Sequence, residues 1–352
     1  MQVREVLGGC RQAGAGQVGY LRAGGQIGGQ EVCALSWKKI AISIVKWLVV
    51  AVPLAFLVSI LAKNYEQLAP ELAHADPRYL VLSELVFLAM TFLFGVVWHL
   101  ETSAIGVGLT WGRALIAYFA SQLGKYLPGK VWMMAARFAI YQSELKDAPR
   151  VSLAVLFEAA LHLGGQLILL VAVAMLWGWG EYGSLRIACI LILLAIMVGS
   201  HPKILEFGLN IVMGLLKRPK VELRLKYGQV LLLYLAYTAV YSIGLAGILL
   251  LYAAFEPLES QILLPLVFSA IASGVSGMLV IFVPAGLGVR EGLMYAMLTP
   301  FIPQHMAALM PIASRFVFVL AQGIMILIGL AGLRRAGIKI ELKSKPGKDG
   351  AS

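Results

Sequence analysis

Charged residues are scarce in this sequence. They make up 13% of the 352 residues, whereas a soluble domain averages roughly 25%. Hydrophobic residues make up 60%, and no packed core could hide that much apolar surface from water. In lipid, only helices and closed barrels satisfy their backbone hydrogen bonds. Because the apolar runs are long rather than alternating, the sequence predicts an all-α polytopic membrane protein.

Residues that bind metals or form disulfides are also few. The three cysteines (Cys10, Cys33 and Cys189) form no CxxC pair, and the five histidines show no metal-ligand spacing. Paired carboxylates are missing from the loops predicted to be cytoplasmic, and there is no ATP-binding motif. We therefore expect no metal, no cofactor and no enzymatic activity.

Six apolar runs, each of about 20 residues, are long enough to cross the hydrocarbon. Two further apolar stretches are interrupted by Pro128-Gly129 and by Pro284-Ala285-Gly286. Proline breaks a helix, so each stretch is predicted to form a broken hairpin, either re-entrant or made of two half-helices. The six predicted spans are Ile40–Ala62, Tyr79–Leu100, Val151–Trp177, Leu185–Ser200, Gln229–Tyr252 and Pro311–Leu333, and the broken stretches are Gly106–Tyr141 and Ile262–Phe301.

The two ends of the chain differ from its apolar middle. Residues 1–36 are rich in Gly and Gln and lack the apolar region of a signal peptide, which predicts a disordered or over-extended tail. Residues 37–335 form the predicted transmembrane domain. Residues 336–352 form a basic tail that we expect in the cytoplasm.

The formal charge of +11 follows the predicted topology. With an inner N-terminus and hairpins that return to their own side, the cytoplasmic segments are 1–39, 101–150, 201–228 and 334–352. These segments hold 23 of the 29 lysines and arginines, and the outer segments hold four. The positive-inside rule therefore predicts a multi-pass protein of the bacterial inner membrane with both termini cytoplasmic. Membrane lipids are the expected partners, and nucleic acid is not needed to explain the charge.

The two broken stretches recur at an offset of 156 residues between Pro128 and Pro284. The same offset carries the second predicted span onto the fifth and the third onto the last. Each unit is then span, broken hairpin, span, and the fourth span reverses the second unit. This pattern predicts an inverted repeat, as in many alternating-access transporters. A chance match of hydropathy stays open, because residue identity between the units is weak.

The first break lies between two lysines, Lys125 and Lys130, which flank Pro128-Gly129. A helix N-terminus freed by the break favours anions, and each lysine adds a full charge, so a lipid phosphate is a natural ligand. The alternative is that both lysines only reach out to the cytoplasmic interface.

The second break contains the glycines Gly286 and Gly288, followed by Arg290 and Glu291. Ionisable groups in an apolar region are costly and usually face a cavity or each other. We expect Arg290 and Glu291 to contact substrate. A structural clamp, with Arg290 bound to carbonyls freed by the bend at Pro284, is an equal alternative.

Glu158 and His162 lie one helical turn apart in the third predicted span. A carboxylate there needs a partner or a purpose. It could pair with a hairpin lysine, carry a proton, contact a cationic headgroup, or belong to a buried structural pair. Glu101, just past the second predicted span, faces either the first hairpin or water.

The segments LGKYLPGKVW (123–132) and VPAGLGVREG (283–292) resemble the lysylphosphatidylglycerol synthase transmembrane region family. This family includes the flippase part of the multiple peptide resistance factor, and the resemblance covers about residues 37–335. It implies movement of a lipid with a modified or phosphate-bearing headgroup between leaflets. The positions that match the family's motifs are Pro128, Gly129, Glu158, Pro284, Gly286, Gly288, Arg290 and Glu291.

Two departures from the family pattern matter. Ala159 and His162 stand where the family often has arginine and an acidic residue, which leaves the preferred charge of the substrate open. Only a short basic segment follows the last predicted span, so we expect no aminoacyl-transfer domain and no synthesis of lysyl lipid by this chain.

The sequence thus favours a translocase for a lipid or lipid-linked, phosphate-bearing substrate. Two alternatives stay open. One is a non-catalytic membrane subunit that recruits a separate synthase or glycosyltransferase to its lipid, and the other is an intramembrane transferase. The expected substrate-binding residues are Lys125, Lys130, Glu158, Arg290 and Glu291, and the expected hinge residues are Pro128, Gly129, Pro284, Gly286 and Gly288.

Overall fold

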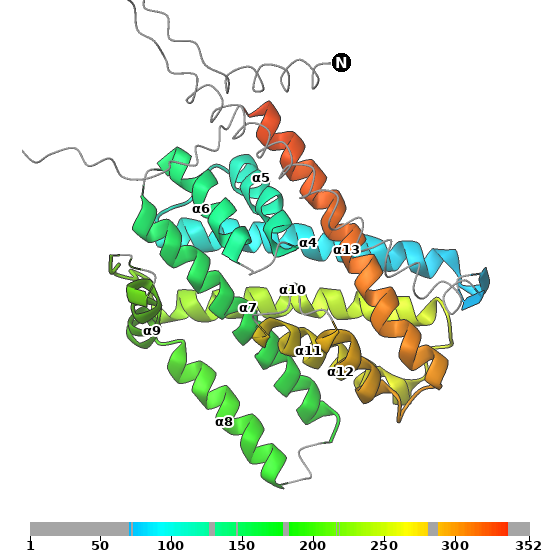
Figure 1. Cartoon of the computed structure of the whole chain (residues 1–352). Coiled ribbons are helices and arrows are strands. Elements are labelled where there is room, and N and C mark those ends of the chain that lie inside the picture. The colour runs from blue at the N-terminus through cyan, green and yellow to red at the C-terminus, as the bar shows by residue number, and fades with distance from the viewer. Residues whose placement is uncertain are drawn as a thin grey trace, which may run out of the picture. The chain divides into compact units, whose positions relative to one another are not determined.

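The computed structural model describes residues 70–126 except 72, 131–178 except 146, 183–215, 217, 219–280 and 288–336. Every regular element within these ranges is a helix (Figure 1), which confirms the predicted fold class. Several predictions lie outside the described residues: the first span, the tail 1–36 and nearly all of 336–352. The same holds for Pro128, Gly129, Lys130, Pro284 and Gly286.

Four long helices correspond to four of the predicted spans. Each has 27 to 32 residues and is apolar enough to cross a bilayer. Their length follows from uninterrupted apolar sequence. They are α4 (Pro77–Ile105), α7 (Ala148–Leu176), α10 (Tyr227–Ala253) and α13 (Gln304–Arg335).

Both broken stretches form pairs of helices that pack against each other. In the first pair, Gly124 lies so close to the next helix that a Cβ atom there would be 2.2 Å from the backbone nitrogen of Met133. Only glycine permits this approach. The first stretch contains α5 (Trp111–Ser121), the 3₁₀ helix η1 (Gln122–Tyr126) and α6 (Val131–Leu145), and the second contains α11 (Ser260–Leu279) and α12 (Val289–Leu298).

The two helices of the second hairpin are unequal in length. At about 1.5 Å per residue, the 20 residues of α11 suffice to cross the hydrocarbon. The prediction of two half-helices in the stretch Ile262–Phe301 did not include a helix of this length. The 10 residues of α12 reach only about half as far.

The fourth predicted span, Leu185–Ser200, corresponds to α8 (Gly183–Gly199), which is followed by a sharp bend. The next helix, α9 (Pro202–Leu215), is turned by 82° from α8, and Figure 1 shows it almost end-on beside α8. The described residues thus contain five helices long enough to span a bilayer, or six if α8 and α9 together form one span.

Helix packing in the unit α4–α7 matches packing in the unit α10–α13. Helix α5 packs on α13 as α11 packs on α7, and α4 packs on α13 as α10 packs on α7. The two units meet where α4 packs on α10. These two helices are antiparallel, because Ser83 donates a hydrogen bond to the Gly247 carbonyl (2.8 Å) and Tyr237 donates one to Glu101 (2.9 Å). Antiparallel partners fit an inverted repeat, although the repeat itself stays a prediction.

The first hairpin reaches the middle of the bundle from one end. Helix α5 runs antiparallel to α13: Ile116 contacts Gly332, near the C-terminal end of α13, and Tyr126 in η1 donates a hydrogen bond to Gln322 (2.7 Å). Gln322 lies near the midpoint of α13. Helix η1 therefore ends at about half the depth of the bundle.

The second hairpin reaches the same depth from the opposite end. Phe268 of α11 packs on Trp177 at the C-terminal end of α7, and Gly274 contacts Gln166, nearer the middle of α7. The opposite, N-terminal end of α7 follows α6, whose Glu144 pairs with Arg113 at the start of α5. Helices η1 and α11 therefore reach the middle of the bundle from opposite ends.

Candidate functional site

Three cationic side chains converge where the two hairpins meet. The Lys125 ammonium in η1 interacts electrostatically with Arg290 of α12 and Arg315 of α13. Arg290 and Arg315 also act on each other and on Tyr126. We call Lys125, Arg290 and Arg315 the central cation cluster. Sequence reasoning selected its first two members but missed Arg315, which lies inside a predicted span without a neighbouring motif.

Glu291 supplies negative charge to the central cation cluster. Its Oε1 lies 3.9 Å from Arg315 Nε, and its Oε2 accepts a 2.7 Å hydrogen bond from the Gly288 backbone N–H. Gly288 has φ +77°, which favours glycine. Glu291 therefore caps the N-terminus of α12 and fixes how Arg290 enters the cluster.

Arg290 reaches the cluster by crossing the surface of α11. A Cβ atom at Gly277 would lie 2.3 Å from Arg290 Cγ, so the arginine side chain runs directly over this glycine. Among the described carboxylates, none forms an ion pair with Lys125 or with Arg290 within 4.0 Å. Among the described carboxylates, Glu291 is paired within the central cation cluster, and Glu158 acts on Lys125 electrostatically.

Glu158 belongs to a different, sealed part of the interior. Its carboxylate forms an ion pair with Arg137 of α6, and the two side chains are 3% and 0% exposed. Arg137 also donates from Nε to the Ser121 hydroxyl (3.0 Å) and stacks on the rings of Trp98 and Tyr118. The partner of Glu158 is thus an arginine of the first hairpin rather than a lysine.

A chain of polar side chains links Glu158 to α10. Its Oε1 lies 3.5 Å from His162 Nε2, and His162 Nδ1 lies 2.7 Å from the Tyr241 hydroxyl, which also accepts from Gln166 (3.0 Å). Lys125 also interacts electrostatically with Glu158. The sealed pair and the central cation cluster therefore belong to one electrostatic system.

Glu101 is a second buried carboxylate, near the C-terminal end of α4. Helix α4 continues to Ile105, so Glu101 lies within the helix and is fully buried. It accepts a hydrogen bond from Tyr237 of α10 (2.9 Å) and interacts electrostatically with Arg137 of the first hairpin, so of the two predicted surroundings it does not face water.

Of the five predicted substrate-binding residues, the structure brings Lys125, Arg290 and Glu291 together. Glu158 acts on this group electrostatically but is closed off by Arg137, and Lys130 lies outside the described residues. Among the predicted hinge residues, Gly288 is the one that is described, with φ +77°, and its role as a hinge stays a prediction.

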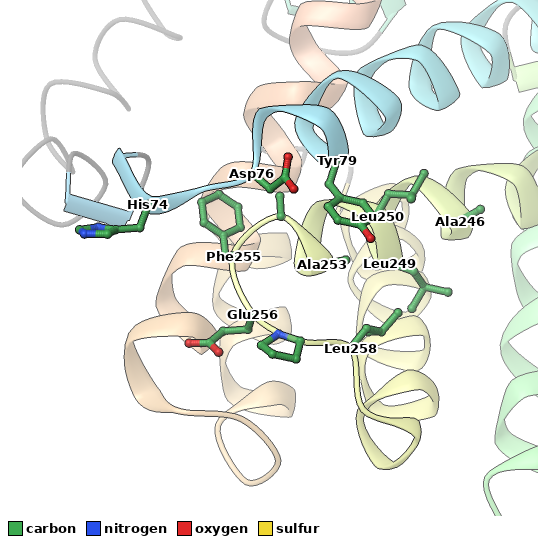
Figure 2. A pocket seen from close by; sticks show the side chains of 12 residues that line it. His74, Asp76, Tyr79, Ala246, Leu249, Leu250, Ala253, Phe255, Glu256 and Leu258 are labelled. Carbon is green, nitrogen blue, oxygen red and sulfur yellow. The ribbon is translucent and has the colours of Figure 1, made fainter.

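A cavity of about 720 Å³ lies away from these charges, where α4 begins and α10 ends. Figure 2 shows its apolar wall, which includes Leu249 and Leu250, with Asp76 and Glu256 on the adjoining loops. None of the predicted site residues lines it. Its acidic and apolar lining differs in charge from the central cation cluster, so the two are separate features.

A bundle of long apolar helices with ionisable groups at mid-depth defines this protein as a multi-pass membrane protein. Residues 40–326 match the family model described as the lysylphosphatidylglycerol synthase TM region. The chain belongs to this family, which represents the membrane part of the synthase and is related to lipid handling. No curated protein matches the chain.

Proposed function

We propose that this protein moves a lipid, or a lipid-linked substrate, with a phosphate-bearing headgroup between the leaflets of the bacterial inner membrane. The observation that carries the proposal is the central cation cluster. Lys125, Arg290 and Arg315 lie together at mid-depth, with Glu291 as the described carboxylate paired among them. Lys125 and Arg290 form no ion pair with a described carboxylate within 4.0 Å. Charge at that depth is costly, and a phosphate headgroup would supply a counter-charge for these two side chains.

The two hairpins suit this task because they bring charge from opposite ends of the bundle to one level. A headgroup bound between the hairpins could pass from one hairpin to the other while the acyl chains of the lipid stay in the bilayer. Inverted repeats with broken helices at mid-depth are typical of transporters that alternate between two sides.

The Arg137–Glu158 pair serves as a latch in this proposal. Both side chains are sealed, and in the proposal this arrangement is the closed one. A phosphate group that bound Arg137, or a proton taken up by Glu158, would weaken the ion pair and allow the first hairpin to move.

The description of the family favours one alternative. A transmembrane region named for a synthase could also present lipid to a separate synthase or glycosyltransferase without moving it. Such a subunit would bind phosphate-bearing lipid through the same central cation cluster.

Leaflet exchange in proteoliposomes separates the two functions. We expect the wild-type chain to speed exchange of a fluorescent anionic phospholipid, and Arg290→Ala to abolish this activity. Arg78→Ala, at the exposed start of α4, is the matched control and should retain full exchange. Exchange by the wild type no faster than in empty vesicles, with a stoichiometric enzyme co-purifying, would support the recruiting subunit instead.

A further inference from the structure

Helix α9 has an ordinary buried face. Leu205, Leu209 and Met213 recur every fourth residue and are all buried. Leu205 and Leu209 belong to the main hydrophobic core. This face holds α9 against the rest of the bundle, where it packs on α7 and α8.

The opposite face of α9 is apolar as well, yet it is exposed. Ile204, Phe207, Ile211 and Leu215 are 47%, 70%, 51% and 78% exposed. At 3.6 residues per turn these four side chains form one stripe on the side away from the buried face. An apolar stripe of this kind on a helix turned 82° from the preceding helix needs an apolar environment beside it.

An extended segment, residues 219–226, is fixed along a third side of α9. Asn210 donates from Nδ2 to the Val221 carbonyl and accepts from the Val221 N–H, both at 2.9 Å, and Glu206 accepts from the Leu223 N–H at 3.0 Å. We call residues 219–226 the strap. Because these three hydrogen bonds join backbone groups of the strap to side chains of α9, the strap is held against the helix.

The strap directs its charges outward. Leu223 and Leu225 are buried, whereas Lys220, Arg224 and Lys226 are exposed, as the two-residue period of an extended chain requires. Glu222 is the single carboxylate on the outward side and pairs with Arg224 at 3.2 Å. The strap therefore presents more positive than negative charge.

Cations also stand at both ends of α9. Lys203 lies in its first turn and Lys217 follows its end, where φ is +54°. With a rise of 1.5 Å per residue these two positions are about 21 Å apart along the helix. If α9 crossed the bilayer, the two charges could not both reach a surface, because 21 Å is shorter than the hydrocarbon core of about 30 Å, and charge inside hydrocarbon is costly. If α9 lies parallel to the membrane plane, both stay at the surface.

We infer that α9 and the strap form a binding site for anionic phospholipid in the cytoplasmic leaflet. The stripe enters the boundary between headgroups and acyl chains, and the cations at the ends of α9 and on the strap contact the phosphates. The excess of cations favours an anionic leaflet over a neutral protein surface. This site is independent of the proposed translocase and would exist equally in a recruiting subunit.

Spin labels in proteoliposomes test the orientation of α9. The full chain, with its three cysteines replaced by alanine, is labelled singly at Ile204, Phe207, Ile211 or Leu215, and at Glu222 of the strap as control. We expect the four stripe labels to share one shallow depth of about 5–10 Å and the strap label to be reached from water. A steady change of depth by about 16 Å from Ile204 to Leu215, or four labels in water as for a protein-docking surface, would overturn the inference.

Lipid selectivity tests the chemistry of the site. Spin-labelled phosphatidylglycerol and phosphatidylcholine compete for the protein in equimolar vesicles of the two lipids. Replacing Lys220, Arg224 and Lys226 with glutamine should lower the preference for phosphatidylglycerol, by up to about fivefold for each cation, and high salt should act likewise. Glu222→Gln, which removes a negative charge from the same exposed surface, should raise it. Unchanged preference in both variants, with retained gel-filtration profiles, would refute an anionic-lipid site.

Discussion

Removing one partner of the sealed pair Arg137–Glu158 should destabilise the protein strongly. Replacing Glu158 with glutamine keeps its shape but leaves the Arg137 charge without its partner, in a place where the two side chains are 0% and 3% exposed. Removing one partner of a buried pair costs about 3–5 kcal/mol. Since the glutamine oxygen can still accept a hydrogen bond, we expect about 3 kcal/mol.

The chain offers a matched pair for comparison. Arg113 and Glu144 also join a helix of the first hairpin to its neighbour, at 2.5 Å, but Arg113 is 52% exposed. Exposed pairs contribute about 0–1 kcal/mol. Glu144→Gln should therefore cost at most about 1 kcal/mol.

A double-mutant cycle isolates the interaction. Arg137→Met with Glu158→Leu removes both charges and keeps apolar volume, so the double variant should be more stable than the single Glu158→Leu variant. The free energy of unfolding is measured by denaturant titration in mixed micelles. Strictly additive costs of the two single changes would refute the reasoning, because they would mean that the two charges do not interact.

Three further predictions concern packing and hydrogen bonds. Gly277→Ala places a methyl 2.3 Å from Arg290 Cγ, so the Arg290 side chain must adopt another conformation. The rate of lipid exchange should fall severalfold, while thermal stability, measured in parallel, changes little. Gly329→Ala on α13 would place a methyl 2.4 Å from the backbone of α5 and should lower the free energy of unfolding in denaturant titration. Gly323→Ala on the same helix meets nothing within 4 Å and should raise the free energy of unfolding by up to about 1 kcal/mol. Equal effects of the two substitutions would contradict the packing of α13 on α5. Tyr237→Phe removes the hydrogen bond to a fully buried carboxylate and should cost about 1–3 kcal/mol in unfolding free energy, and a neutral result would show that the carboxylate has another partner.

The sequence alone determined the class of protein and most of its long helices. Apolar runs of spanning length predict α4, α7, α10 and α13 because a helix in lipid has to satisfy its own backbone. Proline and glycine located both broken stretches for a similarly local reason. The motif that contains Arg290 and Glu291 also led to the family.

Only the tertiary structure decided which charges meet. Arg137 and Glu158 are 21 residues apart, and Glu291 and Arg315 lie on different helices, so no local spacing reveals either pair. The bend between α8 and α9 falls at Gly199-Ser200-His201-Pro202, so its position has a local cause, whereas its angle of 82° comes from the structure. Local composition fixes whether a segment is a helix, whereas partners of buried charges follow from the three-dimensional path of the whole chain.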